Sequence, residues 1–135
     1  PGSLAELLVT ESKNARNIPD GMSFQEAASL PVAALTALNG IRRCGITAGS
    51  KLLINGATGG VGHFAIQIAK TKGAVVTASC SERNRELALQ LGADKVIGYS
   101  REDLINTADA YDVILDAWGQ MKFKDIFRLL KKDGT

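Results

Sequence analysis

The sequence is poor in the residues that build metal centres, disulfide frameworks and catalytic triads. Its 135 residues include two cysteines, one histidine, three prolines and one tryptophan, and only 5% are aromatic. Cys44 and Cys80 have neither metal-ligand spacing nor a disulfide pattern around them. With His63 as the single histidine, the chain lacks the residues for a histidine-based metal site or a Ser-His-Asp triad. We therefore predict no catalytic residue and no metal ligand in this chain.

An excess of one charge and long hydrophobic runs are missing too. The formal net charge is +2, which gives no electrostatic case for a nucleic-acid partner. Apolar runs such as residues 30–38 are too short and interrupted to form a membrane span. The 45% of hydrophobic and 22% of charged residues are typical of one globular domain. No signal-peptide pattern precedes it, and the first residue is Pro1, so we expect a piece of a longer, cytoplasmic polypeptide.

From residue 51 onward, short apolar strands alternate with helical patterns. Strands are predicted at 51–55, 74–78, 95–97 and 111–115, and helices at 61–71, 82–91, 101–107 and 123–130. This alternation is typical of parallel strands joined by right-handed crossovers. The predicted fold class is therefore α/β, with a doubly wound parallel sheet of Rossmann type. The rhythm places a fifth strand where the chain stops at Thr135, so we expect a sheet that is incomplete at the C-terminus.

The first fifty residues do not follow this alternation. A short strand is predicted over residues 4–10. Ser23, with Glu26 three residues later, forms the capping-box pattern that begins a helix. Pro31 is expected to break or restart that helix, so that residues 32–44 form a second one.

The segment that points most directly to chemistry is the turn Gly56-Ala57-Thr58-Gly59-Gly60-Val61-Gly62, between a strand and a helix. The first amides of a helix and the positive end of its dipole attract phosphate, and glycines let the backbone approach a pyrophosphate. Gly62 would let the helix pack closely on the strand. Ala57 replaces the first glycine of the Gly-x-Gly-x-x-Gly pattern, but the surrounding strand and helix favour a dinucleotide site over a structural turn. The neighbouring His63 is expected on the helix surface or in the core.

The tip of the second strand, Ser79-Cys80-Ser81, favours NADPH over NADH. NAD enzymes usually carry Asp or Glu here, and this carboxylate repels a 2′-phosphate. The serines offer hydrogen-bond donors instead, and Arg83 offers a cation for the phosphate. Glu82 argues in the opposite direction because it stands within a residue or two of the critical position. In the alternative interpretation, Ser81 caps a helix and Arg83 is merely solvated.

Four stretches follow one another in an order typical of one enzyme family. They are SLPVAALTA (29–37), the turn at 56–62, AIQIAK (65–70) and LGADKVI (91–97). In this order they resemble the medium-chain dehydrogenase/reductase superfamily, and within it the zinc-free quinone oxidoreductase branch related to zeta-crystallin. The resemblance implies that residues 1–16 end a GroES-like catalytic domain and that 17–135 form a truncated NAD(P)-binding Rossmann domain. Where the zinc-dependent branch has a cysteine ligand, this sequence has Val32, which argues against a catalytic zinc.

The turn, the strand tip and the resemblance together define the candidate cofactor-binding residues. They are Thr36, Gly56, Ala57, Thr58, Gly59, Gly60, Val61, Gly62, Ser79, Cys80, Ser81, Arg83, Tyr99, Trp118 and Gly119. The resemblance implies that residues 58–61 contact the pyrophosphate and that Cys80 lies beside the adenosine ribose. It places Tyr99 at the adenine end, Thr36 near the nicotinamide, and residues 118–119 beside the nicotinamide ribose. For the two aromatic residues, a role without any ligand stays open.

The resemblance implies an NADPH-dependent oxidoreductase that transfers hydride to a quinone, an enone or a related conjugated carbonyl in the full-length protein. The cofactor carries the difficult chemistry. The substrate cleft of such an enzyme lies between two domains, so we expect this chain alone to be inactive. Two alternatives are a nucleotide-binding sensor or structural protein without turnover, and an enoyl-reductase module of a larger synthase. The expected partner is the small-molecule substrate, with a homodimer of the full-length protein as a further option.

Overall fold

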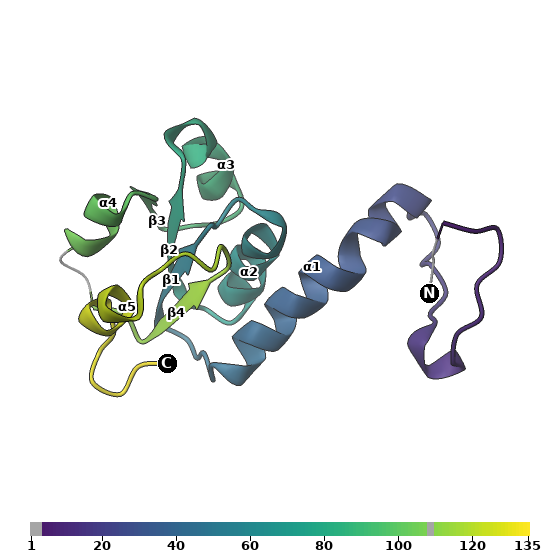
Figure 1. The fold of residues 1–135 in the computed structure, drawn as a ribbon, viewed down its shortest axis with the longest axis horizontal. Helices are drawn as coiled ribbons and strands as arrows, with labels where there is room; N and C mark the ends of the chain where they lie inside the picture. The colour runs from purple at the N-terminus through teal and green to yellow at the C-terminus, as the bar shows by residue number, and fades with distance from the viewer. Residues whose placement is uncertain (1–3, 108–109) are drawn as a thin grey trace.

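A four-stranded parallel sheet forms the centre of the molecule (Figure 1). The computed structural model describes residues 4–107 and 110–135, so the first three residues of the predicted catalytic-domain segment lie outside it. The strand order is β3-β2-β1-β4, as in the first four strands of a Rossmann domain. The strands are β1 (Lys51–Asn55), β2 (Val75–Cys80), β3 (Lys95–Gly98) and β4 (Val113–Asp116). This confirms the predicted doubly wound α/β fold.

Helices cover both faces of the sheet because alternate strand residues point to opposite sides. Leu52 and Ile54 of β1 lie in one core with α1, α2 and α3, whereas Leu53 lies in a second core with α4 and α5. The helices are α1 (Phe24–Arg43), α2 (Gly60–Thr71), α3 (Arg85–Gln90), α4 (Arg101–Ile105) and α5 (Phe123–Leu129), with 3₁₀ turns η1 (Ser12–Asn14) and η2 (Glu82–Asn84). Within the described ranges, none of these helices combines the length and apolar character needed to cross a bilayer.

Helix α1 runs unbroken through Pro31, so the predicted break is wrong. Proline removes one N–H from the helix, but both ends are held independently. The predicted capping box is confirmed, because the Ser23 amide donates to Glu26 at 2.8 Å and the Glu26 amide donates to the Ser23 hydroxyl at 3.2 Å. At the other end, Ala37 and Ile41 are buried in the core. The N-terminal part of α1 projects away from the sheet (Figure 1).

The predicted strand over residues 4–10 is also wrong. Leu7 is 90% exposed and Val9 is 99% exposed. A strand is stabilised by pairing with a neighbour, and none of the described strands of the sheet lies beside this segment. An apolar run therefore does not form a strand here, because the partner that would pair with it is not part of this sheet.

The last residues of the chain lie beside β4, where the alternation predicts a fifth strand. The amide of Ile114 donates to the Thr135 carbonyl at 2.9 Å, and the Thr135 amide donates to the Asp112 carbonyl at 3.0 Å. Tyr111 and Leu130 form an isolated parallel bridge just before. Parallel pairing along the outer edge of β4 thus begins in this segment.

Gly62 sits where α2 approaches the end of β1 most closely. A Cβ atom there would lie 2.7 Å from both Cα and C of Ala57 and would also overlap the carbonyl oxygen of Gly56. These are backbone atoms, so no side chain can move aside to make room. This is the close helix–strand packing that the sequence predicts for Gly62, and it determines where α2 begins.

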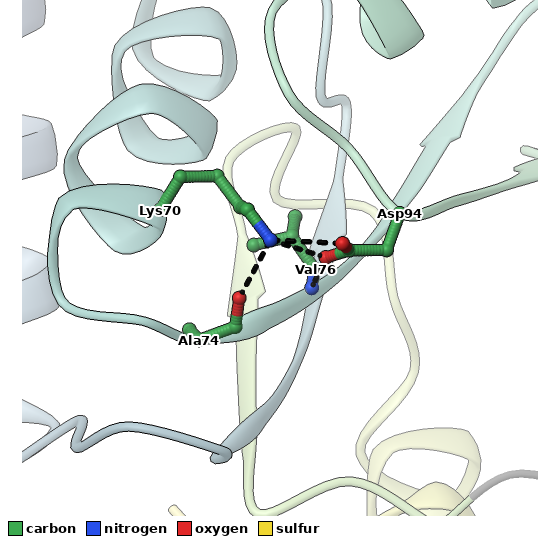
Figure 2. A network of polar contacts seen from close by, with 4 residues as sticks. All are labelled: Lys70, Ala74, Val76 and Asp94. Carbon is green, nitrogen blue, oxygen red and sulfur yellow. Dashed lines mark hydrogen bonds and ion pairs between the residues drawn. The ribbon is translucent and has the colours of Figure 1, made fainter.

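Lys70 and Asp94 join α2, β2 and β3 near the amino ends of the two strands (Figure 2). The Lys70 ammonium donates to both carboxylate oxygens of Asp94 at 2.8 Å and to the Ala74 carbonyl at 3.0 Å. The Val76 amide donates to the same carboxylate at 2.7 Å. The end of α2 is thereby tied to the beginnings of β2 and β3.

Replacing Gly62 should destabilise the fold far more than replacing its neighbour Gly60. We expect Gly62→Ala to lower the free energy of unfolding by about 1–3 kcal/mol through overpacking. At Gly60 the nearest atom to an added Cβ is the Ala33 side chain at 3.9 Å, so Gly60→Ala should be neutral or slightly stabilising. Urea unfolding of both variants measures the difference, and equal stability would contradict the close packing.

Asp94→Asn should destabilise the fold at neutral pH and much less in acid. Burial acts to raise the pKa of Asp94, but the hydrogen bonds from Lys70 and Val76 outweigh it and the pKa is lowered. A lowered pKa stabilises the fold above the unfolded value of about 3.9, and this contribution is lost as the pH falls through the folded value. Because the pair is partly exposed, we expect a loss of about 1–2 kcal/mol at neutral pH.

Urea unfolding of the wild type and Asp94→Asn at about pH 7 and about pH 3 tests this dependence, with the exposed Asp133→Asn as control. The control should match the wild type at both values. A stability difference that is the same in acid as at neutrality would show that the charge of Asp94 is irrelevant.

Candidate cofactor site

The glycine-rich turn lies at the carboxyl ends of the strands, between β1 and α2. Gly56 has a φ of +73°, a conformation that favours glycine. Gly59 is the N-cap of α2, and the first hydrogen bond within the helix runs from the His63 amide to the Gly59 carbonyl at 3.1 Å. The amides of residues 60–61 precede that bond and have no acceptor within the helix. Such amides and the positive end of a helix dipole are the features that attract an anion at a turn of this kind.

A groove of about 400 Å³ opens beside this turn. Its lining residues are Gly56, Thr58, Gly59, Cys80, Ser81, Arg83, Tyr99, Ala117 and Trp118. All of them except Ala117 are among the predicted cofactor-binding residues. The loops after β1, β2, β3 and β4 each contribute, because the carboxyl ends of parallel strands meet at one edge of the sheet.

Other predicted residues are not among those that line the groove. Thr36 is exposed on α1, residues 60–62 form the first turn of α2, and Gly119 has a φ of +74° in the loop after β4. Ala57 is completely buried. Ala57 therefore presents no exposed surface to a ligand.

Ser79 is buried and its hydroxyl is already engaged. It lies 3.1 Å from Oδ1 of Asn55 and 3.2 Å from the Gly98 carbonyl oxygen, and it donates to these acceptors. The hydroxyl that faces the groove at this strand tip is that of Ser81, which makes no capping hydrogen bond to η2. Ser81 thus stands at the N-cap position of η2, as in the alternative interpretation, but its side chain makes no capping hydrogen bond.

Arg83 and Arg85 differ in what they contact. Arg85 donates from Nε to Oε1 of Glu82 at 2.7 Å and from Nη1 to the Val96 carbonyl at 3.1 Å. The hydrogen bond from Arg85 lowers the pKa of Glu82 and holds its carboxylate away from other partners. Arg83 lines the groove, is exposed, and has no ion pair with any residue in the described part of the chain. The groove therefore has an available cation, while the nearby carboxylate is neutralised.

Two residues that the sequence pattern did not single out as site residues organise the loop after β4. Asn55, buried at the end of β1, donates from Nδ2 to Oδ1 of Asp116 at 2.9 Å. Asp116 accepts hydrogen bonds from the amides of Trp118 at 3.2 Å, Gly119 at 2.9 Å and Met121 at 2.9 Å. The signal in the sequence is a polar residue at the end of each of these two apolar strands, β1 and β4.

Thr58 and His63 have local partners. The Asn84 side chain donates to the Thr58 hydroxyl at 3.1 Å and so links η2 to the glycine-rich turn. Nδ1 of His63 is 2.9 Å from the Gly59 carbonyl oxygen, and the ring packs on Phe64 with centroids 4.0 Å apart. This half-buried position on the helix matches the expectation for His63.

The described residues do not fit a metal centre. No group of three or more His, Cys, Asp or Glu side chains within residues 4–107 and 110–135 is close enough to hold a metal ion. The two cysteines are free, and burial raises the pKa of both Cys44 and Cys80. A raised pKa keeps a thiol protonated, whereas metals bind the thiolate.

The chain is similar to known proteins of one enzyme family. A profile of the family described as zinc-binding dehydrogenase matches residues 60–135. The chain is 40% identical over 121 residues, 88% of its length, to a 2-methylene-furan-3-one reductase of Solanum lycopersicum. It is 42% identical over 120 residues, 87% of its length, to a chloroplastic NADPH-dependent alkenal/one oxidoreductase of Arabidopsis thaliana.

A solved structure has the same fold. It is the quinone oxidoreductase from Thermus thermophilus, described together with its complex with NADPH. It matches with a TM-score of 0.78 and 30% identity over 87% of this chain and 40% of that one. The chain spans 31% of the length of each of the two curated relatives. From the family match, the relatives and the fold, the chain belongs to the zinc-binding dehydrogenase family, in the quinone oxidoreductase branch of the medium-chain dehydrogenase/reductase superfamily.

Proposed function

We propose that this chain is the NADPH-binding part of an enzyme that reduces enones, quinones or related conjugated carbonyls. One observation carries the proposal: the groove combines an anion-binding helix start with the guanidinium of Arg83, which forms no ion pair with a described residue. A dinucleotide with a 2′-phosphate presents two anionic groups, a diphosphate and a monophosphate. The two positive features of the groove match that pattern.

Different residues of the chain bind different parts of the cofactor. The amides of residues 60–61 bind the diphosphate, and Gly59 leaves room for it. Ser81 and Cys80 lie beside the adenosine ribose, and Arg83 binds the 2′-phosphate. Glu82 forms an ion pair with Arg85, and this pairing offsets the negative charge that would otherwise repel the phosphate. When bound, NADPH supplies the hydride that reduces an electron-poor carbon of the substrate.

The substrate class is supported by the relatives. One is named for an alkenal/one substrate and one for a quinone, and in both kinds of molecule a carbonyl makes a conjugated carbon electron-poor. We infer that the residues of this chain that line the groove bind and orient the cofactor. The walls of the substrate cleft and any proton donor belong to the rest of the enzyme.

The full-length protein should bind NADPH more tightly than NADH, and Arg83→Ala should remove most of that preference. A charge-assisted contact of this kind contributes about 1.5–3 kcal/mol, or roughly one to two orders of magnitude in affinity. Calorimetric titration with both cofactors measures it. Arg128→Ala, an exposed arginine on α5, is the control and should leave the preference unchanged. Equal affinity of the wild type for the two cofactors would refute the role of Arg83.

Gly59→Val should abolish cofactor binding and enzyme activity without unfolding the protein. Gly59 has an ordinary φ of −78°, and an added Cβ would contact only the Gly56 carbonyl oxygen at 3.2 Å. The valine side chain would instead fill the space for the diphosphate. The wild-type full-length protein should oxidise NADPH in the presence of an enone or a quinone, and the variant should not.

The thermal unfolding midpoint of Gly59→Val, compared with the wild type, separates a lost site from a lost fold. Binding of NADPH by the wild type without oxidation across a panel of enones and quinones would favour a sensor over an enzyme. Unchanged NADPH affinity in the variant would show that the turn does not hold the diphosphate.

A further inference from the structure

Two aromatic rings from different loops meet over the ends of the central strands. The Tyr99 ring follows β3 and the Trp118 ring follows β4, which are the two outer strands in the order β3-β2-β1-β4. Their centroids are 5.7 Å apart and the ring planes are nearly perpendicular, at 88°. Such an edge-to-face contact is a favourable aromatic arrangement.

This contact conflicts with the roles that the family resemblance implies. Tyr99 is expected at the adenine end of the cofactor and Trp118 beside the nicotinamide ribose, and these groups lie at opposite ends of an extended dinucleotide. In the structure Trp118 lines the same groove as Ser81 and Arg83. Thr36, the expected neighbour of the nicotinamide, is not among the residues that line it.

The backbone of Trp118 is held in place independently of Tyr99. Its amide donates to Asp116 at 3.2 Å, and Asp116 is itself held by Asn55 at 2.9 Å. The backbone of Trp118 also packs directly on Gly56, where an added Cβ would lie 3.2 Å from the Trp118 amide nitrogen. Trp118 is therefore held at the groove by contacts with Asp116 at the end of β4, with Asn55 of β1 through Asp116, and with Gly56 of the glycine-rich turn.

The two rings line the groove and leave apolar surface exposed. Both also line an adjoining hollow of about 300 Å³, so the pair separates the two spaces. Tyr99 is 48% and Trp118 54% exposed. Exposed aromatic faces beside an anion-binding groove are suited to a planar base, because stacking buries apolar surface on both partners.

We propose that Trp118, together with Tyr99, binds the adenine base of NADPH, so that Trp118 belongs to the adenosine half of the site and not to the nicotinamide half. The inference rests on the proposed function. Its chemistry is stacking or edge contact of a purine with the aromatic pair, next to the 2′-phosphate position at Arg83.

The test uses a ligand that carries only one half of the cofactor. Adenosine 2′,5′-bisphosphate has the adenine, the ribose and the 2′-phosphate but lacks the nicotinamide ribose. In calorimetric titrations of the full-length protein, Trp118→Ala should weaken the binding of NADPH and of the bisphosphate by the same factor, about tenfold or more. Trp118→Phe should retain most of the affinity for both ligands, because it keeps an aromatic face.

A matched control is Phe123→Ala, which removes an exposed aromatic ring on α5 outside the groove and should change neither affinity. If Trp118→Ala weakens NADPH but not the bisphosphate, Trp118 contacts the nicotinamide half and the inference is overturned. Unchanged affinity for both ligands, or an equal loss in Trp118→Phe, overturns it as well. If the wild type binds neither ligand, the proposed function itself fails, which distinguishes the two failures.

Discussion

The geometry of the whole carboxyl edge depends on the backbone contact between α2 and the end of β1. At Gly62 the helix comes so close to Ala57 that a single methyl group would overlap backbone atoms. This contact determines where the first amides of α2 point and how far they lie from the neighbouring loops. The attraction of a helix start for phosphate falls off within the first turn. A small displacement of α2 would therefore remove the main anion-binding feature of the groove.

A second constraint is the polar chain across the ends of three strands. Ser79 is the last but one residue of β2, Asn55 ends β1 and Asp116 ends β4, and each hydrogen-bonds to the next. Asn55 and Ser79 are buried, so they would be costly to bury without hydrogen-bond partners. Among the described residues, no buried side-chain polar atom lacks a hydrogen-bond partner. The hydrogen bonds from Ser79 through Asn55 to Asp116 also fix the position of the loop that carries Trp118.

At the tip of β2, an ion pair determines which charged side chain is available to a ligand. Glu82, Arg83 and Arg85 lie within four residues and carry a formal net charge of +1. In the structure Glu82 and Arg85 form an ion pair with each other, whereas Arg83 faces the groove. Arg83 thus leaves at the groove a positive charge that no described residue pairs, although the segment carries both signs of charge.

The sequence by itself determined most of the helices and strands and the glycine-rich turn. Strand and helix periods, the capping box at Ser23 and the glycines of the turn are local features, since a few neighbouring residues fix the backbone conformation. The same local reasoning failed at Pro31 and at residues 4–10. In the first case packing of α1 outweighed one lost hydrogen bond, and in the second no partner strand was present among the described strands.

Only the tertiary structure decided which side chains meet at the groove. The contact of Tyr99 with Trp118, the chain from Ser79 to Asp116 and the availability of Arg83 all join residues that different strands carry to one edge. Their spacing along the chain contains no information on these contacts. The strand order and the register of the parallel pairs bring them together, and both are set by long-range packing of the helices on the sheet.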